Sequence, residues 1–282
     1  MLSTHVRRSI HQALPHFLQR GKALTGQLVR YAAGRFARIE EDPIFVIGNQ
    51  KSGTTVLAAA LAHAANMSVT LDIRDLSIGY LLDLYEGVIS VPTFLNRYRR
   101  AFSREVIKEP GLTFAYEKLR VHYPESPFVF VVRDPRDNIR SILNRLGLPG
   151  TASSLSSDQL AELNPIWRHI VNNRALGVET EHYIESLAHR WNRGTDIYLH
   201  HSDRICLARY EQFCSEKTKY IESILQALDL SVVQSPKSVV ETQHQPQGNR
   251  SISWDAFFGP ENLSRIEHIC SENMNVLNYR HS

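Results

Sequence analysis

The sequence has few cysteines, no long apolar run and little glycine or proline, and each shortage excludes a class of protein. Its three cysteines are an odd number without paired spacing, which argues against a disulfide framework or a zinc knuckle and fits a reducing compartment. The longest purely apolar stretches, such as 128–132, are far shorter than the ~20 residues that span a bilayer. Fourteen glycines and twelve prolines exclude collagen-like and low-complexity chains, and a hydrophobic content of 43% excludes disorder. The 282 residues can bury a sizeable core.

Charge is distributed unevenly, and the basic excess lies at the N-terminus. Residues 1–39 carry seven basic residues and no acidic one, whereas the remaining chain has a net charge of −4. A nucleic-acid-binding domain would carry basic charge over its folded core, so no nucleic-acid partner is expected. Basic and apolar residues alternate over 5–38, which favours a helical arm over residues 1–42 that packs on the domain with a solvated basic face. A peripheral membrane contact and a cleaved transit peptide are the alternatives, and the expected location is cytoplasmic.

From residue 43 onward, short apolar runs alternate with helical patterns. The predicted strands are 44–48, 69–73, 105–108, 127–132 and 205–210. The helical patterns cover 54–66, 76–86, 94–103, 112–122, 136–146, 158–173, 177–200, 215–228 and 261–273. This alternation predicts one α/β domain over 43–282, a three-layer doubly wound parallel sheet. Segment 148–203 is too long for a simple crossover, and we interpret it as a helical insertion or lid over the carboxyl edge of the sheet.

The segment 48–55, Gly-Asn-Gln-Lys-Ser-Gly-Thr-Thr, is the strongest motif. It follows a predicted strand and opens a predicted helix, the arrangement that aims backbone N–H groups and the helix dipole at a phosphate. Its candidate ligand-binding residues are Gln50, Lys51, Ser52, Gly53, Thr54 and Thr55. A nucleoside-triphosphate P-loop has a lysine directly after its second glycine, whereas this P-loop-like segment has Thr54 there and its lysine at position 51. No apolar run ends in a magnesium-binding aspartate, so no metal is expected.

A second basic cluster follows the strand predicted at 127–132. Arg133 would lie at the carboxyl end of that strand, where α/β sheets bind ligands. Ser141 and Arg145 follow on one face of the next predicted helix, and Asp137 near its start is an ordinary partner for the helix dipole. Two guanidinium groups and a hydroxyl group would form a phosphate clamp separate from the first. Together, the two clamps predict a ligand that is phosphorylated at two places.

These two segments, 49–57 (NQKSGTTVL) and 131–143 (VVRDPRDNIRSIL), resemble the two nucleotide signatures of the sulfotransferase family. The resemblance implies binding of 3′-phosphoadenosine 5′-phosphosulfate (PAPS), with the first segment at the 5′-phosphosulfate and the second at the 3′-phosphate. It also implies that Tyr210, in an Arg-Tyr-Glu run, lies near the adenine. Gly-Asn-Arg at 248–250, followed by Trp254, is similar to the late loop that closes over the nucleotide, which makes Arg250 a further nucleotide-binding candidate.

Lys108-Glu109-Pro110 is similar to the Lys-Asp-Pro of tyrosylprotein and carbohydrate-type members of the family. Sulfuryl transfer needs a cation at the bridging oxygen, a base for the acceptor hydroxyl and donors for the equatorial oxygens. Within the resemblance, Lys51 is the expected catalytic cation, and Lys108 would supply a second one towards the acceptor. Asp72 is the first candidate for the base, because gap-free counting from the phosphate loop places it where tyrosylprotein sulfotransferases have their catalytic Glu. Glu109 is its rival, and Asp75 or a histidine remains open.

The leading hypothesis is therefore a sulfotransferase that moves a sulfuryl group from PAPS to a hydroxyl acceptor without a metal. A P-loop kinase is the alternative, against which the displaced lysine and the missing magnesium-binding aspartate count. A non-enzymatic nucleotide-binding protein is the third hypothesis, against which the intact Lys51, Arg133 and Ser141 count. The acceptor has no diagnostic motif, and a carbohydrate, a lipid or a small hydroxylated metabolite is favoured over protein tyrosine.

Overall fold

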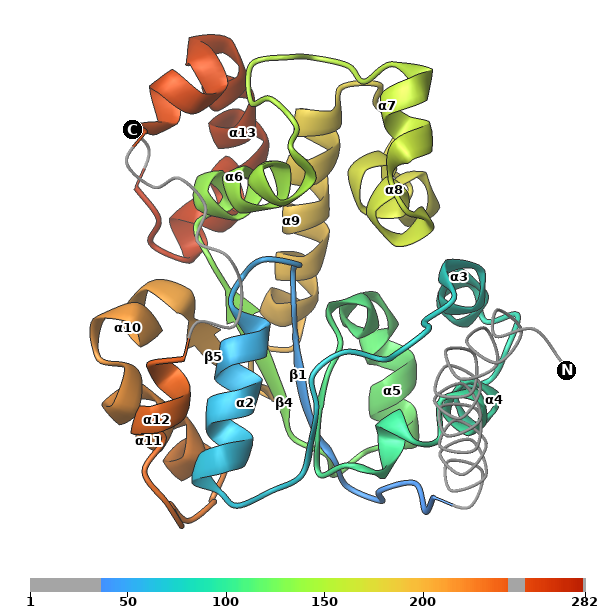
Figure 1. Cartoon of the computed structure of the whole chain (residues 1–282), viewed down its shortest axis with the longest axis vertical. Coiled ribbons are helices and arrows are strands. Elements are labelled where there is room, and N and C mark those ends of the chain that lie inside the picture. The colour runs from blue at the N-terminus through green and yellow to red at the C-terminus, as the bar shows by residue number, and fades with distance from the viewer. Residues whose placement is uncertain (1–36, 243–251, 281–282) are drawn as a thin grey trace, which may run out of the picture.

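The structure of the protein is a computed structural model that describes residues 37–242 and 252–280. Five strands form one sheet: β1 (Ile44–Gly48), β2 (Val69–Thr70), β3 (Val106–Lys108), β4 (Phe128–Val132) and β5 (Ile205–Arg209). The strand order is β2-β3-β1-β4-β5, and every neighbouring pair is parallel. The predicted α/β fold with a parallel sheet is confirmed. Because all strands run the same way, their carboxyl ends meet at one edge, near the middle of the molecule (Figure 1).

Strand β2 is shorter than the predicted 69–73. Its register with β3 ends at Thr70, which pairs with Ile107. Beyond that point the backbone N–H of Ile73 donates to the Glu109 carboxylate (3.2 Å) instead of to a neighbouring strand. The sheet therefore ends early at this edge, and the chain turns away at Asp72.

The side chains of the sheet alternate between two helical layers. Phe45, Ile47 and Phe130 belong to the larger core cluster, which also draws on helices α3 (Ile78–Glu86), α4 (Val91–Arg97), α5 (Tyr116–His122), α6 (Pro135–Leu146), α8 (Pro165–Asn172), α9 (Tyr183–His200) and α13 (Trp254–Val276). Val46 and Val129 face the other cluster, with α2 (Thr54–Ala64), α11 (Lys217–Ala227) and α12 (Lys237–Val240). This is the predicted three-layer arrangement (Figure 1).

Several helix boundaries differ from the predicted ones, and proline or a cap explains the clearest cases. The predicted helix 158–173 is two helices, α7 (Ser157–Glu162) and α8, because the Asn164 side chain caps a new helix that begins at Pro165. The predicted helix 261–273 is the longer α13, which is kinked at Gly259 (φ 71°) and Pro260. The start of the predicted helix 112–122 is a 3₁₀ segment, η2 (Pro110–Ala115), before α5 begins.

Segment 148–203 contains α7, α8 and α9, and these helices are not equivalent. Helix α9 is part of the layer on the sheet, because its Leu187, Arg190 and Trp191 are each about 1% exposed. Helix α7 has no buried residue, and α8 contacts α3 across the middle of the molecule. The lid interpretation therefore stays a prediction for α7 and α8, whereas α9 is a framework helix.

Candidate active site

The loop between β1 and α2 makes a tight turn that only glycine fits at two points. Gly48 has φ 137°, and a Cβ there would lie 2.4 Å from the carbonyl oxygen of Val131. Gly53 has φ 95° and is the N-cap of α2, so no side chain of the cap accepts from the first backbone N–H groups of this helix. An uncapped helix N-terminus behind a glycine turn can accept an anion at the carboxyl edge of the sheet. The loop has the conformation that the sequence predicts for a phosphate site.

Neighbouring elements fix this loop through buried polar contacts. Asn138 of α6 is fully buried, and its Nδ2 donates to the Gln50 carbonyl oxygen (2.9 Å) and to Ser52 Oγ (3.0 Å). From η2, the Thr113 hydroxyl donates to the Gly48 carbonyl oxygen (3.1 Å) and accepts from the Gly48 N–H (2.8 Å). The segments that follow the two neighbours of β1 in the sheet, η2 after β3 and α6 after β4, thus anchor the phosphate loop and preorganise it for a ligand.

Arg133 lies at the end of β4 and joins the two predicted nucleotide segments. Its side chain is buried, and Nη1 donates to the Lys51 carbonyl oxygen (3.2 Å). Its guanidinium carbon lies 4.7 Å from the centre of the Tyr210 ring, and Nη2 lies 3.6 Å from an Asp137 carboxylate oxygen. The Tyr210 ring in turn packs on Gly53, where a Cβ would come within 2.3 Å of it. The structure therefore brings Lys51, Arg133 and Tyr210 together, although they lie far apart in the sequence.

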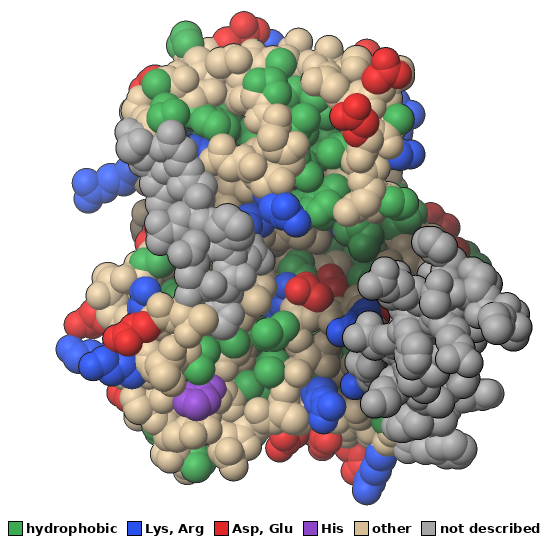
Figure 2. Space-filling view, viewed as in Figure 1, with side chains coloured by type: hydrophobic (Ala, Val, Ile, Leu, Met, Phe, Trp, Pro, Cys, Tyr) green, Lys and Arg blue, Asp and Glu red, His purple; other side chains and the backbone are tan. Residues whose placement is uncertain are grey.

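Four cations converge on the loop. Burial lowers the pKa of Lys51, and the positive charges of Arg145, Arg133 and Lys108 lower it further. These residues come from α6 and from the carboxyl ends of β3 and β4. Repulsion among cations at one edge of the sheet is relieved by a multiply charged anion. Ser141, half-buried on α6, lies between Arg133 and Arg145 along the chain. Figure 2 shows basic and acidic side chains at the waist of the molecule, beside a band of hydrophobic ones.

Lys108 and Asp72 form an ion pair at the neighbouring strand ends. Lys108 Nζ lies 2.5 Å from Asp72 Oδ1, and the two side chains are 5% and 65% exposed. The pair therefore has a buried cation and a carboxylate that is open to solvent. Asp75, the gap-shifted alternative, lies on an exposed turn with φ 58°.

Glu109 has a different environment from Asp72. Its side chain is buried, with one oxygen accepting from the Gly111 N–H (3.0 Å) and the other from the Ile73 N–H (3.2 Å). Burial raises the pKa of Glu109, and Lys108 opposes that rise. With both oxygens bonded to backbone, this carboxylate ties the turn after β2 to the start of η2. Of the two carboxylates, only that of Asp72 is exposed.

The C-terminal part of the predicted nucleotide site is described only in part. Arg250 lies outside the described residues, as do positions 248 and 249. Trp254 Nε1 donates to an Asp137 oxygen (2.9 Å), and the Arg136 guanidinium lies 3.8 Å from the centre of its indole ring. Arg140 donates to the Ile252 carbonyl oxygen (2.7 Å). These contacts hold the start of α13 against α6, next to Arg133.

Three residues that anchor the loop were not predicted from the sequence. Two are Asn138 and Thr113, whose contacts are described above. The third is Arg190 of α9, which donates to the Gln50 side chain (3.0 and 3.3 Å) from a position that is 1% exposed. A signal was present for Arg190, because it lies within the buried stripe that Ile184, Leu187 and Trp191 form along α9. An arginine in such a stripe needs polar partners.

Comparisons with known proteins agree with this geometry. A family profile described as "Sulfotransferase family" matches residues 80–234, which is more than half of the chain and includes Arg133, Ser141, Arg145 and Tyr210. The sulfotransferase STF9 from Mycobacterium avium has the same fold, with a TM-score of 0.53 and 12% identity over 91% of this chain and 81% of that one. No curated protein sequence matches the chain.

Two further solved structures are similar at lower scores. Mouse sulfotransferase SULT7A1, solved in complex with PAP, has a TM-score of 0.49 and 16% identity over 86% of this chain and 88% of that one. A sulfotransferase from Alicyclobacillus acidocaldarius has a TM-score of 0.45 and 16% identity over 83% and 97%. Among residues 37–242 and 252–280, no helix is long and apolar enough to cross a membrane. From the profile match, and with the fold in agreement, the chain belongs to the sulfotransferase family and is a sulfotransferase enzyme.

Proposed function

We propose that this enzyme transfers the sulfuryl group of PAPS to a hydroxyl group of its acceptor. The observation that carries the proposal is the convergence of Lys51, Arg133, Arg145 and Lys108 at the phosphate loop, where burial and then the charges of the other three residues lower the pKa of Lys51. A nucleotide with phosphate at its 3′ position and phosphosulfate at its 5′ position has two separate anionic ends. The loop from Gly48 to Thr55 suits the 5′ end, and Arg133 with Ser141 and Arg145 suits the 3′-phosphate.

The adenine would lie against Tyr210. This ring is held between Gly53 and the Arg133 guanidinium, so its position is coupled to both halves of the proposed nucleotide site. We assign nucleotide binding to Gln50, Lys51, Ser52, Gly53, Thr54, Thr55, Arg133, Ser141, Arg145, Tyr210 and Arg250.

Asp72 is the proposed base of the transfer. Its exposed carboxylate would accept the proton of the acceptor hydroxyl while that oxygen forms a bond to sulfur. The bond between sulfur and the bridging oxygen breaks, and its electron pair stays on the 5′-phosphate, where Lys51 balances the developing charge. Lys108, which pairs with Asp72 at 2.5 Å, orients the carboxylate and adds positive charge on the acceptor side. Glu109 is the second candidate for the base, but its bonds to the Gly111 and Ile73 N–H groups favour a role in tying the turn after β2 to the start of η2.

The transfer is proposed to run without a metal. In phosphoryl transfer, magnesium neutralises charge on the transferring group. Here the positively charged side chains of Lys51, Lys108 and the two arginines lie at the same edge of the sheet, and they would neutralise the negative charge in place of magnesium. Transfer that is unaffected by a chelator is the expected behaviour, and loss of activity with a chelator would contradict this part of the proposal.

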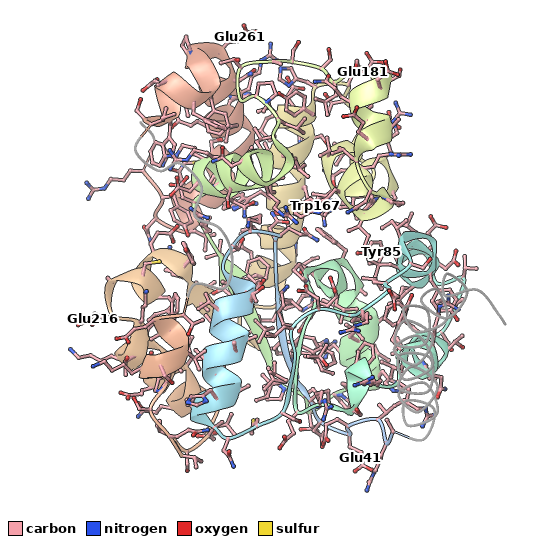
Figure 3. The ribbon with its side chains drawn as sticks, in the orientation of Figure 1. Glu41, Tyr85, Trp167, Glu181, Glu216 and Glu261 are labelled. Carbon is pink, nitrogen blue, oxygen red and sulfur yellow. The ribbon has the colours of Figure 1, made fainter. Side chains whose placement is uncertain are left out.

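The acceptor is proposed to be a carbohydrate, a lipid or a small hydroxylated metabolite. Helices α3 and α8 contact each other, and α3 also contacts η2, which follows β3. Figure 3 shows Tyr85 of α3 and Trp167 of α8 at the waist of the molecule. Both aromatic side chains are half-buried, so they can supply an apolar wall for an acceptor. Helices α7 and α8, within segment 148–203, would act as the lid on this side.

The domain organisation and location remain part of the proposal. We assign one catalytic domain to residues 43–282 and a separate basic arm to residues 1–42, most of which lies outside the described residues. The seven basic residues of 1–39, a stretch without an acid, would suit contact with anionic lipid at the surface of a membrane, in a protein of the cytoplasm.

Calorimetric titration with 3′,5′-adenosine diphosphate (PAP) in the presence of a chelator is the first test. We expect binding that needs no metal, followed by transfer from radiolabelled PAPS to one class of acceptor in a panel of sugars, lipids, small alcohols and tyrosine peptides. Failure to bind PAP, together with binding of ATP and magnesium, would overturn the proposal in favour of a kinase. Transfer to a tyrosine peptide alone would overturn the acceptor assignment while leaving the reaction in place.

A further inference from the structure

A buried arginine lies directly behind the phosphate loop without an acidic partner. Arg190 of α9 donates to Gln50 Oε1 through Nε (3.3 Å) and Nη2 (3.0 Å), and to Asn173 Oδ1 through Nη1 (2.8 Å). The Phe114 ring centre lies 4.5 Å from its guanidinium carbon. Within the described ranges, 37–242 and 252–280, no carboxylate forms an ion pair with Arg190. Its partners among these residues are neutral amides and an aromatic ring.

This placement leaves a positive charge inside the protein. Burial lowers the pKa of Arg190 to about 10, so the guanidinium is still charged at neutral pH. A buried cation without a counter-charge destabilises a protein unless hydrogen bonds or a nearby anion offset the lost hydration. Nearby His169 does not contribute a competing charge, because burial and the charge of Arg190 together lower its pKa to about 4. An anion at the phosphate loop would supply the missing negative charge.

Gln50 is the only described residue that joins Arg190 to the loop through side chains, and its orientation follows from the chemistry of its partner. Arginine donates hydrogen bonds and accepts none, so the side-chain oxygen of Gln50 must face Arg190. The Nε2 group lies on the other branch of the same planar amide and therefore points away from Arg190. Within the described residues, Nε2 donates no hydrogen bond. Gln50 is half-buried and directly precedes Lys51.

Asn173 locks the other end of this arrangement. It is fully buried between α8 and α9, with φ 52°. Its Nδ2 donates to the Ile170 carbonyl oxygen (2.7 Å) and to the backbone and hydroxyl oxygens of Ser186 (both 3.0 Å). Its oxygen must therefore face Arg190, and the guanidinium has one fixed orientation. The result is a chain of oriented groups from α8 through Asn173 and Arg190 to Gln50.

We propose that Arg190 is a positioning residue for the sulfuryl group: it holds Gln50 so that Nε2 donates a hydrogen bond to a sulfuryl oxygen of bound PAPS. The buried charge of Arg190 is balanced when that nucleotide is present. This inference rests on the proposed function, since it concerns the ligand of the same loop. It assigns a specific donor to the equatorial oxygens, one of the three requirements of sulfuryl transfer.

The variant Gln50→Glu separates the two roles of this side chain, which are to accept from Arg190 and to donate to a sulfuryl oxygen. Glutamate has nearly the same shape and still accepts from Arg190, but it gives the buried cation a counter-charge and removes the Nε2 donor. We expect the melting temperature to rise, while the affinity for PAPS falls at least tenfold and more than the affinity for PAP, which lacks the sulfuryl group. Unchanged affinity for PAPS would overturn the proposal. Equal losses for PAPS and PAP would overturn the assignment to the sulfuryl group.

A double-mutant cycle tests the route through Gln50. Arg190→Lys keeps the charge but cannot donate two N–H groups to one oxygen in the same plane. We expect this change to lower PAPS affinity when Gln50 is present and to add little in a Gln50→Ala background. The same loss in both backgrounds would overturn the positioning role. If Arg190→Lys does not fold, Gln50→Glu alone tests the proposal, because we expect that variant to be more stable than the wild type and therefore to fold.

Asn262→Ala is the matched control for lost stability. This buried amide donates to the carbonyl oxygens of Gly150 and Ala152, in a loop that contributes nothing to the proposed nucleotide site. We expect a lower melting temperature with unchanged affinity for PAPS and PAP. A parallel loss of PAPS affinity in the control would overturn the proposal, because general destabilisation would then explain the Arg190 effect. A wild-type chain that binds neither nucleotide would overturn the proposed function itself, which is a different result from a wild-type chain whose binding is insensitive to Gln50.

Discussion

Replacing Arg133 by Met should weaken the binding of PAP much more than the binding of AMP. Methionine keeps the apolar volume of the buried side chain but removes every N–H donor. If Arg133 holds the 3′-phosphate, the loss is that of a hydrogen bond between charged groups, about 1.5–3 kcal/mol. At 1.4 kcal/mol per tenfold change, this corresponds to a roughly 10- to 150-fold weaker Kd for PAP. AMP lacks the 3′-phosphate, so its affinity should change by less than about threefold on the same scale.

The same substitution has a separate cost in stability, which can be worked from its contacts. The Arg133→Met change removes one hydrogen bond to the Lys51 carbonyl oxygen and the stacking on Tyr210. The ion contact with Asp137 (3.6 Å) is also lost, but it adds little, because Asp137 keeps its closer partners Arg140 (2.6 Å) and Trp254 (2.9 Å). The hydrogen bond and the stacking are each worth about 1 kcal/mol, so the free energy of unfolding should fall by about 2 kcal/mol. For a domain of this size, that is a decrease of about 4–8 °C in melting temperature. This decrease must be distinguished from the effect on binding.

Arg209→Met is a matched control for that purpose. The Arg209 side chain also donates to one backbone carbonyl oxygen, that of Leu277 (2.5 Å), and also stacks on a tyrosine, Tyr279 (5.4 Å). It therefore loses the same kinds of contact next to α13, away from the phosphate loop. We expect a similar decrease in melting temperature with unchanged PAP affinity. The assay is calorimetric titration of both variants with PAP and with AMP. Equal losses for the two nucleotides, or a loss in Arg209→Met as large as in Arg133→Met, would refute the assignment of Arg133 to the 3′-phosphate.

Much of the sheet and of the phosphate loop could be predicted because their signals are local. Strands β1 and β4 are continuous apolar runs, and both are buried along their whole length. The spacing of Gly48 and Gly53 reflects backbone conformations that other residues rarely adopt. Since parallel strands end at the same edge, predicting the strands also placed Arg133 and Lys108 near the loop.

The features that could not be predicted depend on partners from distant elements. In the sequence, Asn138 is an ordinary residue of a predicted helix. Its hydrogen-bond partners, the Gln50 carbonyl oxygen and Ser52 Oγ, lie in the loop after β1 and come close only in the folded chain. Glu109 and Asp72 are similar candidates for a base in the sequence. They are separated by the burial of Glu109 and by its bond to the distant Ile73 N–H, whereas Asp72 is exposed. The break at Pro165 is different, because its signal is local: an Asn directly before a Pro is a typical helix start.

Three further predictions test the chemistry of the site. Asp72→Asn should lower the transfer rate roughly 10²- to 10⁴-fold. PAP affinity and melting temperature should be almost unchanged, because the Lys108–Asp72 ion pair has an exposed carboxylate and contributes about 1 kcal/mol or less to stability. Retained transfer would exclude Asp72 as the base. Glu109→Gln, which keeps an oxygen to accept from backbone, should transfer within about tenfold of the wild-type rate, and a loss as large as that of Asp72→Asn would make Glu109 the base. The third prediction concerns the dependence of stability on pH. Burial and the neighbouring cations lower the pKa of Lys51 in the folded protein below its ordinary 10.5. Between the lowered pKa of Lys51 in the folded protein and its ordinary pKa in the unfolded chain, the unfolded chain binds more protons than the folded one. The stability contributed by Lys51 therefore rises with pH over this interval. Urea unfolding of the wild-type protein and of Lys51→Met should therefore show a difference in stability that shifts in favour of the wild type as pH increases towards 10.5, and that shift should shrink when PAP supplies negative charge. Parallel curves for the two proteins without PAP would contradict the crowding of cations on which the proposed site depends.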